Sequence, residues 1–356
     1  MGDLEKNNIV IEEILAEGKI DDIEKVFNKA FKDYETIFEV TKEELKWENS
    51  FPMNNAYFLA KCFENPVGLI QIVERIVNVN GSVIKVGMVA KVAVLDEYRK
   101  RGIFKLLLNK AELYAKSRGY DAIVGYANRN EIISQLFLKY SYRALVCRYG
   151  VVRVLDADIM AKALGREEII DLLRDMSEIT SSLELTEEYE IVDYNPEYVD
   201  GIKEMIEEMK FDYYPIFAPK EMEWRFEKIK QEFEADTKLL LCKNRVVGLL
   251  RCSIKNFWFR KKNECAVKNL TIDDCFAVGN HVEALKILVN IRLSEAKKQG
   301  IHNVVAFFPV NTTSQKMFED LKFISEIDTV LMVKSLSSKG ELAFSKKIRS
   351  FFDYYI

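Results

Sequence analysis

Three consecutive cationic residues and a glycine lie where an apolar strand leads into a helix. The segment DEYRKRGIFKLLL, from Asp96 to Leu108, places the cations at Arg99, Lys100 and Arg101 and the glycine at Gly102. Cations are unfavourable at a helix N-terminus, and glycine is a poor helix former. A bound anion would reverse both penalties, because backbone N–H groups of the first helical turn would point at it and glycine would allow its close approach. The segment therefore predicts a phosphate-binding site.

This segment does not have the form of the commonest nucleotide-binding motifs. The chain contains neither GxxxxGK(S/T) nor GxGxxG, so a P-loop is excluded and a Rossmann dinucleotide loop is unsupported. The two histidines, His281 and His302, have no ligand-like spacing, which argues against a His-based metal site and a Ser-His-Asp triad. The six cysteines form no CxxC pair and are expected to be free thiols in a reducing compartment.

Composition and charge are those of an ordinary globular protein. The chain has 356 residues, of which 49% are hydrophobic and 30% charged, and its formal net charge is -4. Without a basic excess, it is not expected to bind nucleic acid. The first residues are polar and acidic, unlike a signal peptide, and no apolar run reaches the roughly 20 residues needed to span a membrane. We therefore expect a cytoplasmic protein without a membrane partner; the sequence does not indicate an oligomeric state.

Three landmarks of the first half recur, in the same order, about 180 residues later. The matching pairs are VGLI and VGLL (67–70 and 247–250), Trp47 and Trp224, and the segments that begin at Asn130 and Asn311. A repeat of this length predicts two similar domains in tandem. The boundaries that we expect are a first domain at 1–155, an acidic helical connector at 156–187, a second domain at 188–335 and a helical tail at 336–356.

Each half has the same predicted order of strands and helices. Apolar periodicity indicates a strand, an amphipathic helix, a charged helix around the tryptophan, a hairpin of two strands, a long apolar strand, a helix, a strand, a short helix and a last strand. In the first half a hairpin turns at Asn80–Gly81, a dipeptide typical of tight turns. The predicted fold class is α/β (α+β), with a mixed, largely antiparallel sheet flanked by helices in each half.

The order strand, RxxGx, helix, strand, short helix, strand resembles the GNAT superfamily of acyl-CoA-dependent N-acyltransferases. Of the family motif (Q/R)-x-x-G-x-(G/A), Arg99 and Gly102 match, whereas Phe104 takes the last position. The run VNVNGSVIKVGMVAKVAVLDEYRKRGIFKLLL is most similar to the N-terminal domain of multi-domain GNAT enzymes that acetylate aminoglycosides and other polyamines. Tandem GNAT domains also occur in N-myristoyltransferases, mycothiol synthases and the aminoacyltransferases of peptidoglycan bridges.

The resemblance implies that acetyl-CoA, a coenzyme A thioester, binds the first half. The pantetheine arm would pair with the backbone of the strand before the motif, at Val92 and Val94. The diphosphate would lie on the loop and helix start that consist of Arg99, Lys100, Arg101, Gly102, Ile103 and Phe104. Asn130 resembles a family asparagine that contacts the coenzyme, although a helix N-cap is an equally good reason for it. The acceptor amine would attack the thioester directly, without a covalent enzyme intermediate.

Proton transfer is the part of the reaction that the sequence leaves open. Lys91 stands where some GNAT enzymes have a glutamate that acts as base, and Phe137 where many have a tyrosine that acts as acid. Tyr140, one helical turn after Phe137, is either a candidate acid or a packing aromatic. By analogy with N-myristoyltransferases and aminoglycoside acetyltransferases, the C-terminal carboxylate of Ile356 is a candidate base; otherwise the tail covers the core.

The second half does not repeat the cationic segment. Its counterpart reads DDCFAVGNHVEAL, with Gly279 but no arginine or lysine, and Phe318 takes its tyrosine position. We therefore expect the second half to shape the substrate cleft and to stabilise the first half, without binding acyl-CoA productively.

The expected activity is transfer of an acyl group, with acetyl expected, to a small-molecule amine. The acidic excess in residues 167–212 would attract a cationic amine or polyamine, although solvated helix faces are the commoner reason for such a bias. Two alternatives stay open. One is a non-catalytic acyl-CoA-binding sensor, which Lys91 and Phe137 would suit. The other is a tandem-GNAT aminoacyl or peptidyl transferase, against which the RKRG segment argues.

Overall fold

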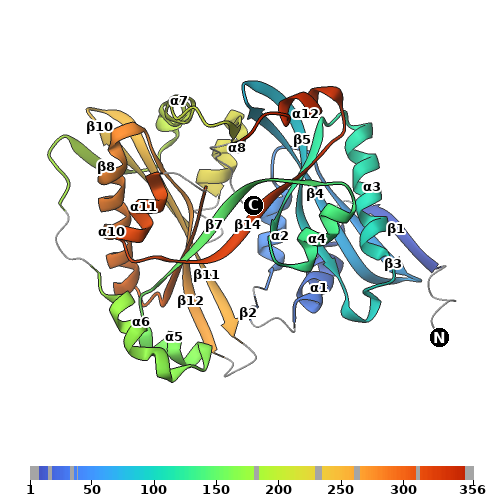
Figure 1. Ribbon diagram of the computed structural model, residues 1–356, viewed down its shortest axis with the longest axis horizontal. Helices are drawn as coiled ribbons and strands as arrows, with labels where there is room; N and C mark the ends of the chain where they lie inside the picture. Colours follow the sequence, from blue (N-terminus) through green and yellow to red (C-terminus); the bar gives the residue numbers. More distant parts are fainter. Residues whose placement is uncertain are drawn as a thin grey trace. The chain divides into compact units, whose positions relative to one another are not determined.

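A computed structural model describes residues 8–14, 18–32, 36–37, 39–179, 184–228, 235–259, 265–309 and 313–348. The chain forms two compact units. Unit 1 combines Met1–Leu145 with Val330–Ile348, and unit 2 is Val146–Thr329. Each unit is a sheet flanked by helices (Figure 1), which confirms the predicted fold class. Within the described ranges, no helix is both long and apolar enough to span a membrane.

The strands in the sheet of unit 1 are, in spatial order, β1 (Ile9–Ile14), β3 (Asn55–Cys62), β4 (Asn65–Val79), β5 (Ser82–Val94), β6 (Ala122–Asn128) and the end of β14 (Ile324–Ser335). In this order the strands from β1 to β5 pair antiparallel, and β5 pairs parallel with β6. The helix between them, α3 (Ile103–Ser117), is the crossover that a parallel pair requires.

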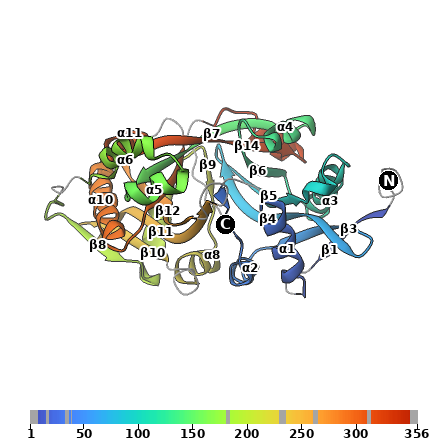
Figure 2. The same cartoon turned by 90° about the horizontal axis from the view of Figure 1, so that it is seen from below.

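Helices cover both faces of this sheet. On β4, the Cβ direction of Gly68 points at Ile103 of α3, whereas the guanidinium of Arg75 lies over the ring of Phe51, just after α2 (Lys42–Asn49). Side chains of even and odd residues on a strand point to opposite faces, so α3 and α2 lie on opposite faces. Helix α1 (Ile20–Ala30) packs beside α2 (Figure 2).

The second unit repeats the element order of the first. The strands of its sheet, in spatial order, are β8 (Tyr189–Asp193), β10 (Ala235–Cys242), β11 (Arg245–Phe259), β12 (Cys265–Ala277), β13 (Asn303–Pro309) and β7 (Arg143–Val154). Strands β12 and β13 are its parallel pair. Its helices are α7 (Val199–Glu208), α8 (Pro219–Met222) with a π-helical turn (Glu223–Lys228), α10 (Val282–Lys298) and α11 (Thr313–Asp320). A further short strand in this unit is β9 (Tyr213–Pro215), and the short strand β2 (Thr36–Ile37) belongs to unit 1.

The expected connector is helical and belongs to unit 2. It contains α5 (Ala157–Leu164) and α6 (Ile170–Ser177). Met160 and Leu173 of these helices are buried in one cluster with Val154 and Val267. The connector therefore adds to the core of the second unit, because its apolar faces pack against the ends of β7 and β12.

The last strand of each half belongs to the other unit. Most of β7 pairs antiparallel with β13, from Asn303 opposite Val154 to Pro309 opposite Arg148. The end of β14, from Val330, is the neighbour of β6 in unit 1. This division places residues 330–348 with the first half, whereas the sequence repeat assigned 330–335 to the second domain and 336–356 to a separate tail.

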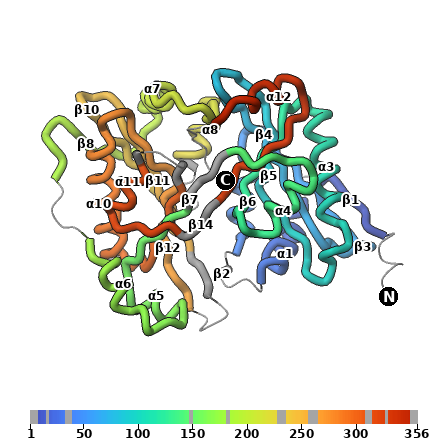
Figure 3. Tube along the Cα trace, in the orientation of Figure 1, coloured from blue at the N-terminus to red at the C-terminus, as the bar shows by residue number. Residues whose placement is uncertain are grey.

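Hydrogen bonds hold the chain after β14 in unit 1. The N–H groups of Leu336 and Ser337 donate to the Asp121 carbonyl over 2.8 and 3.2 Å, and the Ser337 side chain caps α12 (Ser338–Ala343). Gly340 lies so close to the Asp121 carbonyl that a Cβ there would clash with it. Helix α12 contacts β5 (Figure 3). The start of the predicted helical tail therefore packs on the first sheet, with Phe344 and Ile348 buried.

Candidate functional site

Strand β5 carries a β-bulge at the residues that precede the cationic segment. Ile70 of β4 pairs with Val92 and Ile72 with Val89, so that Ala90 and Lys91 together face the single residue between them on β4. The parallel pairing of β5 with β6 ends at the same Val89, although both strands continue. A bulge bends a strand and increases its twist, so it accounts for the separation of β5 from β6.

The separated end of β5 contains both valines that were predicted to bind the coenzyme through their backbone. Val92 and Val94 pair with β4 on one side, and the registered pairs with β6 have already ended on the other. An extended chain can add to such a strand edge through main-chain hydrogen bonds. The geometry therefore suits an extended ligand arm beside Val92 and Val94, and their contact with it stays a prediction.

The loop after β5 leads into α3, whose N-cap residue makes no side-chain capping hydrogen bond. Gly102 is the N-cap, with φ 83° and ψ 5°, and the first turn of α3 contains no acidic residue. Lys100 also has a positive φ, 63°. A Cβ on Gly102 would have no atom within 4 Å, so backbone conformation explains the glycine, and the space above it is open. Such a helix start, with Ile103 and Phe104 as first residues, can receive an anion.

The three cations of this loop differ in what they contact. The guanidinium of Arg99 donates to the carbonyls of Val94 and Ala30, both over 3.1 Å, and pairs with Asp96 at 2.8 Å. Arg101 donates to the Glu97 carbonyl over 2.9 Å. Lys100 is exposed and has no ion pair with a described residue. The hydrogen bonds of Arg99 thus hold the loop against α1 and β5. Among the three cations, the ammonium group of Lys100 is the most accessible to a phosphate.

Phe104 contacts the short helix α4 (Ile132–Lys139) through aromatic rings. Its ring centroid lies 5.8 Å from that of Phe137 in an edge-to-face arrangement and 5.9 Å from that of Tyr140. Phe137 is fully buried, whereas Tyr140 is half-buried at the end of α4. The residue that departs from the family motif therefore packs against both positions considered for a proton donor, and Tyr140 has the hydroxyl.

Lys334, on the exchanged strand β14, contacts the end of α4. Its Nζ donates to the Tyr140 carbonyl over 3.2 Å and pairs with both carboxylate oxygens of Glu112 at 2.8 Å. Tyr142 donates to the same carboxylate over 3.3 Å, and burial, followed by the charge of Glu112, raises the pKa of its phenol well above the ordinary value. The Tyr142 hydroxyl therefore stays protonated, and the cluster positions Tyr140.

A second group that sequence reasoning missed lies beside the bulge. Nζ of Lys91 is 2.5 Å from a carboxylate oxygen of Glu48 on α2, and their side chains are only 8% and 2% exposed. Burial and the Glu48 charge raise the pKa of the nearby Tyr57 phenol well above its usual range. The only sequence signal was the helical spacing of Glu44, Trp47 and Glu48, all of which are buried.

Two predicted site residues have no established contact. Asn130 is exposed and precedes Glu131, which is the N-cap of α4, so the capping explanation for Asn130 is not supported. Ile356, the candidate base, lies outside the described residues. Among those that are described, no three His, Cys, Asp or Glu side chains are arranged to hold a metal ion.

The corresponding helix start in unit 2 differs from that in unit 1. Gly279 has φ 50° and opens a 3-10 turn, Gly279–His281, that leads into α10. Glu283 lies in the first turn of α10, where a carboxylate would repel an anion. Phe318, in the expected tyrosine position, is fully buried. The two helix starts therefore differ in both conformation and charge, and the absence of a phosphate site from the second half stays a prediction.

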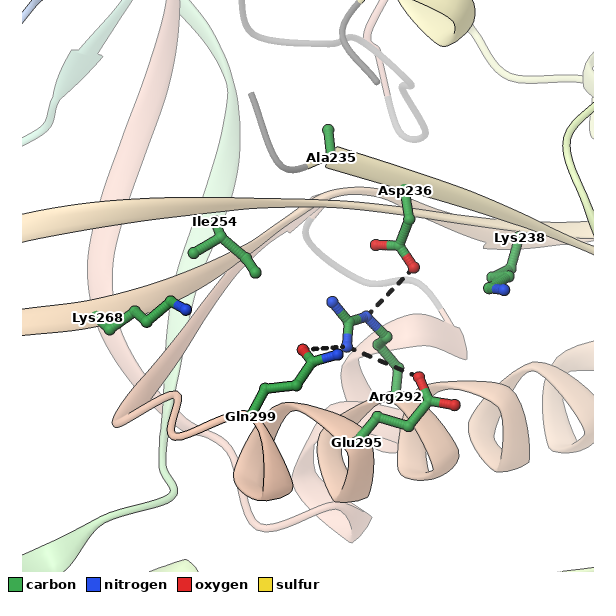
Figure 4. Close-up of a pocket in the computed structure, with 8 residues that line it drawn as sticks. All are labelled: Ala235, Asp236, Lys238, Ile254, Lys268, Arg292, Glu295 and Gln299. Atoms are coloured by element: carbon green, nitrogen blue, oxygen red, sulfur yellow. Dashed lines mark hydrogen bonds and ion pairs between the residues drawn. The ribbon is translucent and has the colours of Figure 1, made fainter. Parts of the chain in front are cut away.

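A concavity of about 810 Å³ lies in unit 2 at the far end of α10 (Figure 4). At its centre the side chain of Arg292, only 6% exposed, lies 3.4 Å from Asp236 of β10 and 3.7 Å from Glu295, and it donates to Gln299 over 3.2 Å. Two carboxylates thus compensate one guanidinium. The arrangement links α10 to β10, and its central side chains leave no excess positive charge to select an anion.

Comparisons with known proteins agree with this architecture. Residues 13–136 match the model of the acetyltransferase (GNAT) domain. No curated protein sequence is similar enough to count as a match. Among solved structures, N-myristoyltransferase of Saccharomyces cerevisiae with bound myristoyl-CoA is similar, with a TM-score of 0.73, 13% identity, and coverage of 92% of this chain and 79% of that one. A second structure of that enzyme with bound myristoyl-CoA has a TM-score of 0.72 and 12% identity. The match covers 92% of this chain and 82% of that one.

The match to the GNAT domain model lies within the first half of the chain, at residues 13–136, and the tandem GNAT-like fold expected from the repeat is confirmed. The domain match supports the class of acyl-CoA-dependent N-acyltransferases. The similarity to N-myristoyltransferase, at 13% identity, concerns the fold.

Proposed function

We propose that this protein is an N-acyltransferase that transfers an acyl group, with acetyl-CoA as the expected donor, to the amine of a small molecule. The observation that carries the proposal is the combination in unit 1 of two features. One is the separation of β5 from β6 after Val89, and the other is the uncapped helix start at Gly102 that follows directly on the chain. The first would receive an extended pantetheine arm, and the second the diphosphate.

Catalysis in this site would consist chiefly of positioning. The backbone of β5 near Val92 and Val94 would hold the thioester, and a strand N–H would polarise its carbonyl. The amine would attack the carbonyl carbon and form the amide bond while the C–S bond breaks and the coenzyme thiolate leaves. The proton lost by the amine would pass to a base, for which the C-terminal carboxylate of Ile356 is the candidate. Tyr140 is the proposed donor of the proton that the thiolate takes up, because its hydroxyl-bearing ring lies against Phe104 at the start of α3.

Calorimetry with coenzyme A and an assay of thiol release test the proposal. We expect coenzyme A to bind one site per chain, and acetyl-CoA to release thiol only when a suitable amine is added from a panel that includes polyamines. An acyl-CoA series from acetyl to myristoyl determines the donor, since the similar N-myristoyltransferase structures contain myristoyl-CoA. If neither coenzyme A nor any acyl-CoA binds, the proposal is wrong.

A non-catalytic acyl-CoA sensor is the second candidate function. Two observations favour it: Lys91 is neutralised by Glu48, and Phe137 has no proton to donate. A sensor would bind acetyl-CoA as tightly as the enzyme would, but no amine in the panel would accelerate thiol release above the rate of hydrolysis.

A further inference from the structure

We propose that Glu48 and Lys91 form a positioning clamp that fixes the bulge of β5, and that Arg225 and Asp274 form the same clamp in the second unit with the charges reversed. The inference rests on the proposed function in one respect: it assigns the first clamp to holding the strand segment that would bind the coenzyme arm. Lys91 is then a positioning residue and not the base of the reaction.

The register of the two sheets establishes which residues correspond. Gly68 of β4 pairs with Val94, and Gly248 of β11, its repeat, pairs with Ala277. Counting along the strands from these pairs, residues 70 and 72 face 92 and 89 in unit 1, while 250 and 252 face 275 and 272 in unit 2. Both sheets thus have a bulge at the same place, and Lys91 and Asp274 hold equivalent positions in it.

The strand separation repeats at the bulge as well. In unit 1 the parallel pairs of β5 and β6 end at Val89 opposite Gly125. In unit 2 those of β12 and β13 end at Ile272, the residue equivalent to Val89, opposite Ala306. Bulge and separation therefore occur together in both units, including the unit that lacks the cationic loop.

The helical partners correspond too. Glu48 follows the buried Trp47, and Arg225 follows the buried Trp224, the repeat of Trp47. Arg225 and Asp274 are each only 1% exposed in their side chains and lie 2.7 Å apart. Like Lys91 with Glu48, this pair connects the helical segment after the tryptophan to the bulged strand.

Reversal of polarity distinguishes a positioning role from proton transfer. The attraction of two opposite charges is the same whichever element has the cation. Proton transfer does not tolerate this exchange, because a guanidinium keeps its proton and an ammonium and a carboxylate differ in basicity. What both units share is a buried ion pair between helix and bulge, and in unit 2 the carboxylate of Asp274 also pairs with Arg251 at 3.1 Å. Loss of one partner would leave a buried charge uncompensated and would disturb the bulge.

Charge reversal in the first unit provides the test. The variants are Glu48→Gln, Lys91→Met and the reversed double variant Glu48→Lys with Lys91→Glu, which gives unit 1 the polarity of unit 2. We expect each single variant to weaken coenzyme A binding by about tenfold or more, and the reversed pair to restore it to within a few-fold. The pH profile of turnover should keep its shape in the reversed pair.

Two results would overturn the clamp. One is a folded reversed variant that binds coenzyme A as weakly as the single variants. The other is a reversed variant that binds normally but loses turnover or shifts its pH profile, since that would identify a proton-transfer role. If the reversed chain does not fold, Lys91→Arg replaces it: this variant keeps a cation opposite Glu48, so a weakened coenzyme A affinity or an altered pH profile contradicts the clamp.

Hydrogen exchange separates failure of the clamp from failure of the proposed function. Even if coenzyme A does not bind, the single variants should exchange the amides of residues 90–94 faster than the wild type, and the reversed pair should return them to the wild-type rate. Equal exchange in all variants would refute the clamp whatever the ligand is.

Discussion

The phosphate site can be tested at Gly102, because the backbone conformation of this residue determines how much unfolding free energy a substitution would cost. Its φ of 83° lies in the left-handed region, and a Cβ there would have no atom within 4 Å. Gly102→Ala should therefore cost only backbone strain, about 1–2 kcal/mol of unfolding free energy. The added methyl group would stand in the open space over the first turn of α3, where the diphosphate is proposed to lie.

Gly119 is a matched control at the other end of the same helix. Its φ is 69°, and a Cβ on it would likewise have no atom within 4 Å. Gly119→Ala should lose the same 1–2 kcal/mol in a chemical denaturation experiment. Calorimetry should show normal coenzyme A affinity for Gly119→Ala and at least about a tenfold loss, 1.4 kcal/mol, for Gly102→Ala.

Gly102→Asn separates strain from obstruction. Asparagine tolerates the left-handed conformation better than alanine, so this variant should lose less stability than Gly102→Ala while still placing a side chain over the helix start. If Gly102→Ala and Gly102→Asn both bind coenzyme A as tightly as the wild type, the diphosphate does not lie at this helix start, and the reasoning from the loop is refuted.

Three further outcomes are expected. Tyr140→Phe should lower turnover by roughly 100-fold and leave coenzyme A affinity unchanged, as measured by thiol release and calorimetry; unchanged turnover would remove Tyr140 as the acid. Lys334→Met should destabilise the protein by about 1–3 kcal/mol in urea, because the largely buried carboxylate of Glu112 loses its cation; no change would show that the pair is dispensable. Cys252 should resist iodoacetamide in the native protein at pH 8, because it is buried and burial raises the pKa of its thiol; mass spectrometry with a denatured control measures this, and rapid native labelling would contradict it.

Local features of the fold could be predicted from the sequence because short-range chemistry determines them. The turn at Asn80–Gly81 was predicted from the dipeptide, and both residues have a positive φ, as a tight hairpin turn requires. The helix expected from Gly102 begins at Ile103, with Gly102 as its N-cap. Both signals lie within a few residues of the feature that they produce.

The contacts that could not be predicted join residues far apart in the chain. Glu48 and Lys91 are 43 residues apart and Glu112 and Lys334 are 222 apart, and no local pattern indicates which charges will meet. Arg99 was expected to bind phosphate from its place in the motif, but its contacts with Val94, Ala30 and Asp96 depend on how α1 packs. The exchange of β7 and β14 was missed because either strand is apolar enough to complete either sheet.

That exchange has a consequence for any attempt to divide the gene. A fragment that stops after the first 155 residues would leave β6 without β14, its neighbour on the side away from β5, and would leave β7 without β13. Two copies of such a fragment could satisfy each other only by trading their final strands, as in a domain-swapped dimer. The duplicated chain thus resembles a domain-swapped homodimer whose two subunits are joined in one chain. The sheet of each unit includes the last strand of the other half.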